Sequence, residues 1–386
     1  MRILHTSDWH IGKRLMGRER LDEQAEVLDE IADLCDAEQI ELVLIAGDIF
    51  DTYTPSAEAE DLFFQKIKRL AGEHRAVLII SGNHDDGVRL SAVSPIAEQQ
   101  GIYVVGNARK PLKIVEGGRK TRPVISGKGY AVFENGVGER AYISTLPYPN
   151  EARFKEERSE LSYIEQMQNW IAEGMAYNAD KLPSVFVAHI FVAGGEASDS
   201  EREIDLGGAR AIPYTALPNA DYIALGHLHK KQRMGKGHCY YSGSPLQYAF
   251  DERPDKSVKV FDLSVKGVEN LRDLPLTKGK KLIRLEADGA DSALALLTNY
   301  PDNFVELKLL LNSPLTSSDT SALAQCKNLV SLLTEIQTEE KLEWETRKGL
   351  SDEGLFDAFY KTAYNAEPKP ELKNLFLTTL AETQEE

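Results

Sequence analysis

Short apolar runs alternate with amphipathic stretches through the first 81 residues. Residues 2–6, 41–46 and 76–81 have the apolar content of buried strands, whereas residues 21–37 and 56–71 repeat apolar positions at helical spacing. Strands that alternate with helices in this way predict a largely parallel sheet flanked by helices. The chain therefore begins as an α/β domain.

The pattern changes after Pro111, where strand-like segments are separated by glycine and asparagine. One of these interruptions, Glu134-Asn135-Gly136, has the composition of a hairpin turn. A helix at about 162–177 leads into two buried strands, at 184–189 and 222–225, and short strands continue to about residue 273. We expect this first domain to span residues 1–275.

The rest of the chain predicts two further units. The pattern becomes strand, helix, strand, helix over about 281–347, which indicates a small α/β domain at 276–349. Two short amphipathic helices, 352–363 and 370–383, form a C-terminal helical segment at 350–386. Two such helices cannot bury both apolar faces against each other, so we expect them to dock on a partner or on the body of the protein. The alternative is a helical hairpin packed on its own domain. The apolar residues concerned are Leu355, Phe356, Phe359, Tyr360, Leu372, Leu375, Phe376 and Leu380.

Composition and charge exclude several classes of protein. The 45 Lys+Arg and 61 Asp+Glu residues give a net charge of −16, which argues against a basic nucleic-acid coat protein. Cys35, Cys239 and Cys326 lie far apart, which argues against a disulfide framework or a structural zinc site and favours a reducing cytoplasm. No signal core and no apolar run of about 18 residues is present, so neither export nor membrane insertion is expected.

Side chains with metal-binding chemistry directly follow five of the predicted strands. Ligand sites of α/β folds gather at the edge of the sheet where the carboxyl ends of the strands meet. The set mixes carboxylate, amide and imidazole groups, which suits Mn²⁺ or Fe²⁺ better than Ca²⁺. The residues concerned are Asp8, His10, Asp48, Asn83, His84, His189, His227 and His229.

The spacing within this set favours a two-metal site. In D-x-H and H-x-H, a one-residue interval on an extended chain puts both side chains on the same side. Gly47 and Gly82 precede Asp48 and Asn83, and glycine there permits a sharp turn and a close backbone approach. Two metal ions ~3.5 to 4 Å apart need a shared ligand, and a single carboxylate between two groups of histidines suits that role. Asp48 is the candidate bridge.

Other polar residues near these motifs have competing interpretations. His5 lies inside the first strand and is expected to be a core residue or to support the site, whereas His74 and His238 have no motif context and are expected at the surface. Asp51 and Asp85 either orient metal-bound histidines or are solvated turn residues. A lone histidine after a buried strand is more often a core residue than a ligand, but the joint occurrence of the motifs reverses those odds.

The motifs DWH, GDIFD, GNHD, a lone histidine after a strand, and GHLH occur in that order, and this order resembles the calcineurin-like metallophosphoesterases over about residues 1–270. The resemblance implies a four-layer αββα core with a small α/β capping domain and a C-terminal helical partner-binding tail. HTSDWHIGK, ALGHLHK and YSGSPLQYAFDE are similar to the branch of this family that contains DNA nucleases working with an SMC-like ATPase.

The same resemblance implies roles for the strand-end residues. His84 is not a ligand in this family but contacts the scissile phosphate and protonates or stabilises the leaving oxygen, while a metal-held water or hydroxide attacks phosphorus. The usual activator is Mn²⁺. Asp51 is a departure, because archaeal and eukaryotic relatives often have a histidine near that position. One metal ion would be held by Asp8, His10, Asp48 and His229, and the other by Asp48, Asn83, His189 and His227.

The implied activity is ATP-coupled double-strand 3′→5′ exonuclease and single-strand or hairpin endonuclease action in DNA repair and recombination. The implied partners are DNA, the ATPase and a second copy of the chain within a heterotetramer, with no membrane involved. The stretches 56–71 and 90–97 match the helices through which the family dimerises, although ordinary packing on the sheet is the alternative. A metallophosphatase, a cyclic-nucleotide phosphodiesterase and a catalytically silent scaffold are rival functions.

A basic cluster follows the first metal motif. Basic side chains beside a phosphodiester site favour contact with the DNA backbone, but the nearby acids Glu19, Asp22 and Glu23 favour a solvated loop equally. The cluster consists of Lys13, Arg14, Arg18 and Arg20.

Overall fold

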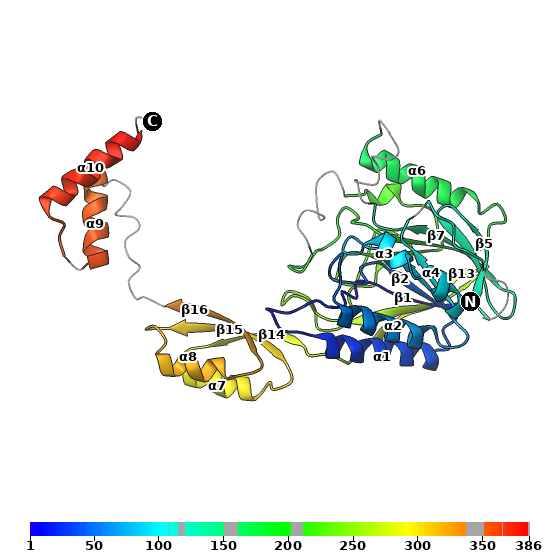
Figure 1. Cartoon of the computed structure of the whole chain (residues 1–386), viewed down its shortest axis with the longest axis horizontal. Coiled ribbons are helices and arrows are strands. Elements are labelled where there is room, and N and C mark those ends of the chain that lie inside the picture. The colour runs from blue at the N-terminus through cyan, green and yellow to red at the C-terminus, as the bar shows by residue number, and fades with distance from the viewer. Residues whose placement is uncertain are drawn as a thin grey trace.

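The computed structural model describes residues 1–107, 109–114, 120–149, 161–201, 211–336, 351–364 and 366–384. Its core is a pair of sheets packed face to face, with helices on both outer surfaces (Figure 1). The predicted four-layer αββα arrangement is therefore confirmed. Within the described part of the chain, none of the helices combines the length and apolar character that crossing a membrane demands.

The first sheet has six strands in the order β13-β12-β1-β2-β3-β4. The first four strands of the chain pair in parallel, as the alternation of strands and helices predicts, and β12 then adds antiparallel to β1. The strands are β1 (Arg2–Thr6), β2 (Leu42–Ala46), β3 (Ala76–Ile80), β4 (Ile102–Val105), β12 (Ser257–Ser264) and β13 (Gly267–Pro275).

The second sheet has seven strands in the order β10-β11-β9-β8-β7-β6-β5. The expected hairpin joins β6 to β7, and the amide of Asn135 donates to the carbonyl of Glu139 at 3.0 Å. The strands are β5 (Arg122–Gly127), β6 (Tyr130–Glu134), β7 (Arg140–Leu146), β8 (Ser184–His189), β9 (Tyr222–Gly226), β10 (Gln232–Arg233) and β11 (Cys239–Tyr241).

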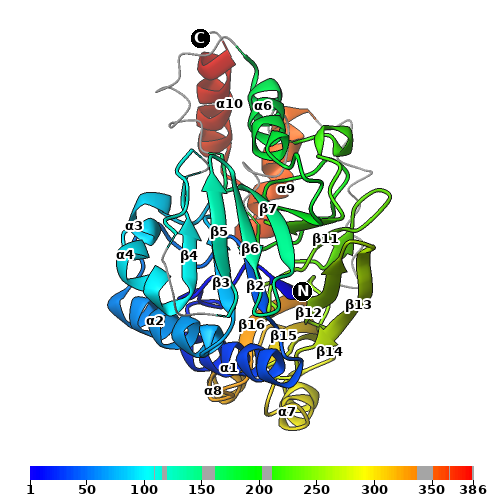
Figure 2. The ribbon, with the colours of Figure 1, turned by 90° about the vertical axis from the view of Figure 1, so that its right-hand side faces the viewer.

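Helices cover the outer faces because their apolar residues recur on one side. Helix α1 buries Val27, Ile31 and Cys35 against the first sheet, and α2 packs beside it, while α6 covers the second sheet (Figures 1 and 2). The helices of the core are α1 (Leu21–Ala37), α2 (Ala57–Ala71), α3 (Gly87–Ser91), α4 (Ser94–Ala97) and α6 (Tyr163–Ala176), with 3-10 turns η1 (Glu98–Gln100) and η4 (Tyr214–Ala216).

The central layer of the core lies between the two sheets, where Leu42 and Leu44 from β2 meet Phe133 from β6 and Val185 from β8. All four side chains are inaccessible to solvent. Burial on both faces explains why β2, β3 and β4 are apolar at every position rather than at alternate ones. Cys35 and Cys239 are buried and Cys326 is partly buried, and all three are free thiols.

The core sheet ends at Pro275, and a third, three-stranded parallel sheet follows in the order β14-β15-β16. It contains one strand more than the sequence pattern indicates. The elements are β14 (Leu282–Ala287), α7 (Ala290–Thr298), β15 (Phe304–Leu311), α8 (Ser317–Ala324) and β16 (Leu329–Ile336). The expected end of this unit at residue 349 lies outside the described residues.

The two C-terminal helices form close to the expected positions, as α9 (Asp352–Tyr364) and α10 (Pro370–Gln384). The rings of Phe356 and Phe376 stack between them with centroids 4.2 Å apart. In Figure 1 the pair stands apart from the two large sheets. Phe359 and Leu375 remain 63% exposed, so the pairing leaves apolar surface uncovered.

Candidate metal centre

The loops that leave β1, β2 and β3 and the ends of β8 and β9 meet at one edge of the two sheets. They bring together every strand-end residue singled out from the sequence, and the side chains are almost entirely buried. This assembly follows from the topology, since β1 to β3 are parallel neighbours and β8 and β9 are parallel neighbours in the facing sheet. The residues are Asp8, His10, Asp48, Asn83, His84, His189, His227 and His229.

The backbone at this edge is strained. Asp8, His10, Asp48 and His227 all have positive φ, at 55°, 45°, 52° and 110°. Such conformations cost energy in non-glycine residues and are concentrated at functional sites. Backbone hydrogen bonds between the first two loops hold two of them, because the amide of Asp8 donates to the carbonyl of Gly47 and that of His10 to the carbonyl of Asp48, each at 3.0 Å.

Glycines at the strand ends permit the close packing of the loops. Gly47 has a φ of 91°, and a side chain there would collide with the imidazole of His189. A side chain at Gly82 would collide with the carboxylate of Asp48. The prediction that these two glycines allow a close approach is confirmed.

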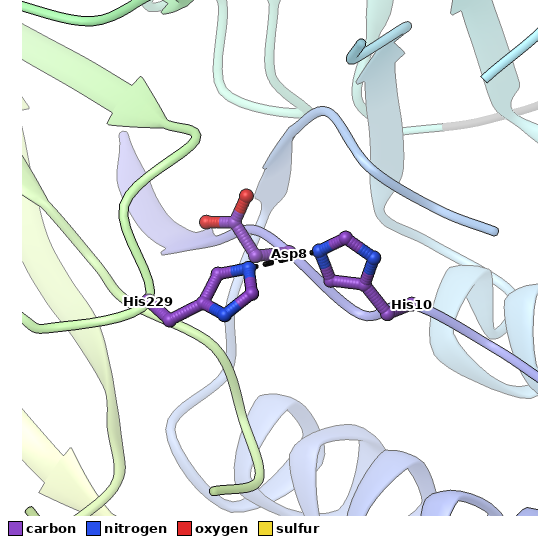
Figure 3. A group of neighbouring side chains, drawn as sticks. All are labelled: Asp8, His10 and His229. Atoms are coloured by element: carbon purple, nitrogen blue, oxygen red, sulfur yellow. Dashed lines mark hydrogen bonds between the residues drawn. The ribbon is translucent and has the colours of Figure 1, made fainter. Parts of the chain in front are cut away.

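One group of potential ligands consists of Asp8, His10 and His229 (Figure 3). Nε2 of His10 lies 2.9 Å from Nε2 of His229. One ring nitrogen of each histidine and a carboxylate oxygen of Asp8 lie within 4.8 Å of one another. Three buried donors facing one point, two imidazole nitrogens and a carboxylate, can coordinate a transition-metal ion.

Asp48 occupies the middle of the cluster. Its Oδ2 is 3.4 Å from Nε2 of His10 on one side and 3.4 Å from Nε2 of His189 on the other. Its Oδ1 accepts a hydrogen bond from the backbone amide of His84 at 2.8 Å. A carboxylate placed between two histidines in this way fits a bridging ligand.

A second group gathers around Asn83. Its Oδ1 lies 2.8 Å from Nε2 of His189 and 3.1 Å from Nδ1 of His227. Nδ1 of His189 donates to the carbonyl of Ala46 at 2.8 Å, which directs Nε2 toward Asp48 and Asn83. Asp8 also reaches this side, because its Oδ1 accepts from the amide of His227 at 2.9 Å.

His84 forms a third group of potential ligands with His10 and Asp48. Its Nδ1 donates to the backbone carbonyl of Asp51 at 2.7 Å, which sets the tautomer of the neutral ring. Its ring meets that of His10 edge-on, with centroids 4.6 Å apart. A nitrogen of His84 also lies within 4.8 Å of ligand atoms of His10 and Asp48.

Burial and mutual attraction shift the titration of the cluster. Burial raises the pKa of Asp8 to about 6 and lowers the pKa of His10 to about 3. Burial opposes the charged form of His189, but the carboxylates of Asp48 and Asp8 outweigh it and raise the pKa of His189 to about 9. Burial acts against ionised Asp48 as well, yet the imidazoles of His189 and His10 keep its pKa well below the usual range.

Sequence reasoning missed the residues that support His229. Nδ1 of His229 lies 2.5 Å from the hydroxyl of Ser200 and 3.5 Å from Oε1 of Glu252. Glu252 is buried and pairs with Lys256 at 2.5 Å. A carboxylate behind a histidine orients the ring and raises its basicity. The segment YSGSPLQYAFDE ends with Glu252, and its acidic terminus is the signal that could have found this residue.

The two acidic turn residues have different roles. Asp51 does contact a histidine, because its Oδ1 is 3.3 Å from Nδ1 of His10. Among the described residues, Asp85 makes no hydrogen bond or ion pair with a histidine, and it is buried, so neither interpretation of it is right. Its buried carboxylate accepts from the backbone amides of Ile49, Phe50 and Gly82 at 2.8–3.1 Å and ties the second loop to the third.

The remaining histidines are where the sequence indicates. His5 is buried in the core, with Nδ1 3.1 Å from the hydroxyl of Tyr222, and His74 and His238 are exposed.

The basic cluster after the first motif forms internal contacts. Lys13 pairs with Asp51 at 3.0 Å and Arg14 with Glu19. Arg18 donates to the carbonyls of Lys327 and Leu329 around the start of β16, and buried Arg20 donates to the carbonyl of Gln247 at 2.5 Å. These contacts argue against an open basic patch at this position.

The fold and the cluster of buried side chains at the sheet edge define the class of protein to which this chain belongs. The family model described as calcineurin-like phosphoesterase matches residues 1–231, and the chain belongs to that family. The chain is 33% identical to the D subunit of the nuclease SbcCD from Bacillus subtilis over 405 aligned positions, covering 100% of this chain and 99% of the relative. It is 34% identical to the corresponding protein of Rhodobacter capsulatus, over 75% of this chain and 72% of the relative. Within the class, the chain belongs to the SbcD family.

Among solved structures, a dimetal phosphatase from Danio rerio aligns with a TM-score of 0.41 at 12% identity, covering 72% of this chain and 99% of that structure's chain.

Proposed function

We propose that this chain is a metal-dependent DNA nuclease that hydrolyses phosphodiester bonds. The observation that carries the proposal is the buried cluster of imidazole, carboxylate and amide groups at the sheet edge, in a chain whose relatives are named as parts of a nuclease. The proposed activity is ATP-coupled double-strand 3′→5′ exonuclease and single-strand or hairpin endonuclease cleavage, in DNA repair and recombination.

The donor set fits two divalent ions, and its mixture of nitrogen and oxygen ligands favours Mn²⁺. Asp48 would bridge the two sites. Two ions bound there supply an activated water and stabilise the charge that develops on the phosphate. The first site would use Asp8, His10, Asp48 and His229, and the second Asp48, Asn83, His189 and His227.

His84 is proposed as the residue that handles the proton of the leaving group. Its contact with the carbonyl of Asp51 fixes the ring beside His10, close to the ligand atoms without a place in either proposed set. A neutral imidazole with a fixed tautomer can donate or accept a proton near neutral pH. His84 would contact the scissile phosphate and protonate or stabilise the departing oxygen.

We propose three regions: a nuclease domain at 1–275, a capping domain at 276–349 and a partner-binding tail at 350–386. The exposed apolar side chains of α9 and α10 support docking of the tail on an SbcC-like, SMC-type ATPase. Phe63 and Ile67 of α2 are buried in the core, whereas Phe64 and Ile96 are 45% and 76% exposed. These two exposed side chains support dimerisation through α2, α3 and α4, giving a homodimer within a heterotetramer. A concentration-independent monomer with full cleavage activity would contradict the dimer.

One assay tests the proposed activity. The chain is incubated with Mn²⁺, with and without ATP and the ATPase partner, on a labelled DNA hairpin and on a chromogenic phosphomonoester. Cleavage of the hairpin, stimulated by ATP in the presence of the partner, is expected. Hydrolysis of the monoester alone would replace the nuclease with a metallophosphatase, and no hydrolysis of either substrate under both conditions would favour a catalytically silent scaffold.

A further inference from the structure

Tyr248 fills the space behind two of the clustered histidines. Its ring meets that of His10 edge-on with centroids 5.5 Å apart, and that of His229 with centroids 5.6 Å apart. Its hydroxyl donates to the backbone carbonyl of Trp9, one residue before His10. The side chain is buried. A displacement of this ring would therefore displace both imidazoles, because a close-packed interior leaves no space to absorb it.

The same ring is connected to the third sheet through Arg20. The guanidinium of Arg20 lies 5.9 Å from the centroid of the Tyr248 ring and 5.5 Å from that of Phe304, the first residue of β15. Arg20 is only 2% exposed. A desolvated cation between two aromatic rings attracts both of them, so Arg20 joins a residue of the site to a residue of the third sheet.

The residue next to Tyr248 makes a second connection to the same sheet. The side-chain oxygen of Gln247 accepts from the amide of Leu282 in β14 at 3.0 Å, and the carbonyl of Gln247 accepts from Arg20 at 2.5 Å. Arg18 adds hydrogen bonds to the carbonyls of Lys327 and Leu329. The contacts of Arg20 and Gln247 thus lead from the third sheet to the segment containing Tyr248, and those of Arg18 attach the sheet to the core nearby in the sequence.

We propose that Tyr248 is a positioning residue through which the third sheet sets the relative placement of His10 and His229. Arg20 and Gln247 transmit the position of β14 and β15 to the Tyr248 ring, and the ring transmits it to the two imidazoles. A ligand that presses on the third sheet would change the metal affinity of the first proposed site by this route. This inference rests on the proposed function for its biological purpose, but the physical link can be measured without DNA.

The test uses the full chain with three variants. Phe304→Leu removes the ring beneath Arg20, far from the histidines, and Tyr248→Leu removes the ring between them. Leu309→Ala is the matched control, because Leu309 is fully buried in the core of the third sheet and belongs to a different apolar cluster from Phe304. Histidine-selective NMR spectra are recorded on the metal-free chain, and Mn²⁺ affinity is measured by calorimetry.

Phe304→Leu and Tyr248→Leu are expected to shift the resonances of His10 and His229 and to weaken Mn²⁺ binding about tenfold, as changes to groups that orient metal ligands do. Leu309→Ala is expected to leave the histidine resonances and the Mn²⁺ affinity unchanged. Parental resonances or parental affinity in Phe304→Leu would overturn the link, and so would an equal effect of Leu309→Ala. If Tyr248→Leu does not fold, the spectra and the Mn²⁺ affinity of Phe304→Leu alone decide whether the third sheet is linked to the two histidines. A parent chain that binds no Mn²⁺, or that cuts no DNA even with ATP and the ATPase partner, would refute the proposed function, while the spectra would still decide the link.

Discussion

At the scale of single residues, a substitution of His84 tests whether this side chain acts in catalysis, as proposed, or in metal binding. Its ring is held by the hydrogen bond from Nδ1 to the carbonyl of Asp51, and its backbone amide donates to Oδ1 of Asp48, so a substitution that keeps the first contact should leave the loop in place. We predict that His84→Asn lowers DNA cleavage by about 10²- to 10⁴-fold, because the proton donor is lost. Mn²⁺ stoichiometry, measured by calorimetry, should stay at the parental value.

The control for this variant is His74→Asn, since His74 is an exposed residue outside the site. It should cleave at the parental rate. A His84→Asn chain that cuts as fast as the parent would show that the proton is handled elsewhere.

Gly82 provides a second prediction at this scale. A methyl group there would collide with the carboxylate and backbone nitrogen of Asp48. We predict that Gly82→Ala lowers the free energy of unfolding by about 1–3 kcal/mol, the usual cost of overpacking, and weakens Mn²⁺ binding. Gly289→Ala is the matched control, because a methyl group at Gly289 would meet nothing within 4 Å. Thermal unfolding of the two variants checks the difference, and equal melting temperatures would contradict it.

The clustered residues could be named from the sequence because each follows a strand within a short motif. Glu252, Ser200 and Asp85 could not be assigned their contacts in the same way. Glu252 is 23 residues from the histidine that it supports, and Asp85 binds backbone amides of another loop. A hydrogen bond between distant segments depends on how the loops pack, and neither periodicity nor motif spacing contains that information.

At the scale of elements, the pairing of β1 with β12 includes an ion pair that makes stability depend on pH. Nε of Arg2 donates to Oδ1 of Asp262 at 2.8 Å, and Nη2 donates to Oδ2 at 3.3 Å. The hydrogen bond from Arg2 lowers the pKa of Asp262. Because this pKa is lower in the folded protein, the ion pair stabilises the fold at pH values above about 3.9, the pKa of an aspartate in the unfolded chain. The stabilisation is lost as the pH falls through the pKa of Asp262 in the folded protein.

We predict that Asp262→Asn lowers the free energy of unfolding by at most about 1 kcal/mol at pH 7, because both side chains are partly exposed. The difference between parent and variant should shrink as the pH falls below about 4. Urea unfolding at several pH values measures it. A difference that stays constant down to pH 2 would mean that the ion pair is not its source.

The helices show where element prediction is reliable. The long helices α1 and α2 repeat their apolar positions over several turns, and the structure has them at the expected places. The stretch at 90–97 is instead divided between α3 and α4. Asp86 caps α3 by accepting from the amides of Val88 and Arg89, and Pro95 lies at the start of α4. A proline lacks the amide hydrogen that a continuous helix needs, so a new helix begins there.

At the scale of the whole molecule, the net charge of −16 bears on how DNA is held. Affinity for nucleic acid comes mainly from basic side chains that release counterions from the phosphates, and the basic cluster after the first motif is engaged in internal contacts. Two divalent ions would outweigh the carboxylates of Asp8 and Asp48 and make the edge of the site locally positive.

We therefore predict that the isolated, metal-free chain binds DNA weakly at physiological salt, with a dissociation constant no tighter than about 10⁻⁶ M, as for non-specific contacts. Fluorescence anisotropy with a labelled duplex measures this constant. Addition of Mn²⁺ under conditions that prevent cleavage should strengthen binding, and an uncharged oligomer of the same length is the control. Tight binding by the metal-free chain would contradict the electrostatic account.

The α/β class, most of the order of the elements and the residues that cluster at the sheet edge could be predicted from the sequence alone, because hydrophobic periodicity and short motifs are local properties of the chain. Three relations appear only in the folded protein: Asp48 lies between two groups of histidines, Glu252 lies behind His229, and the Tyr248 ring lies between those of His10 and His229 and the guanidinium of Arg20. Those relations join residues tens to hundreds of positions apart. They exist only once the two sheets have packed and their loops share one edge.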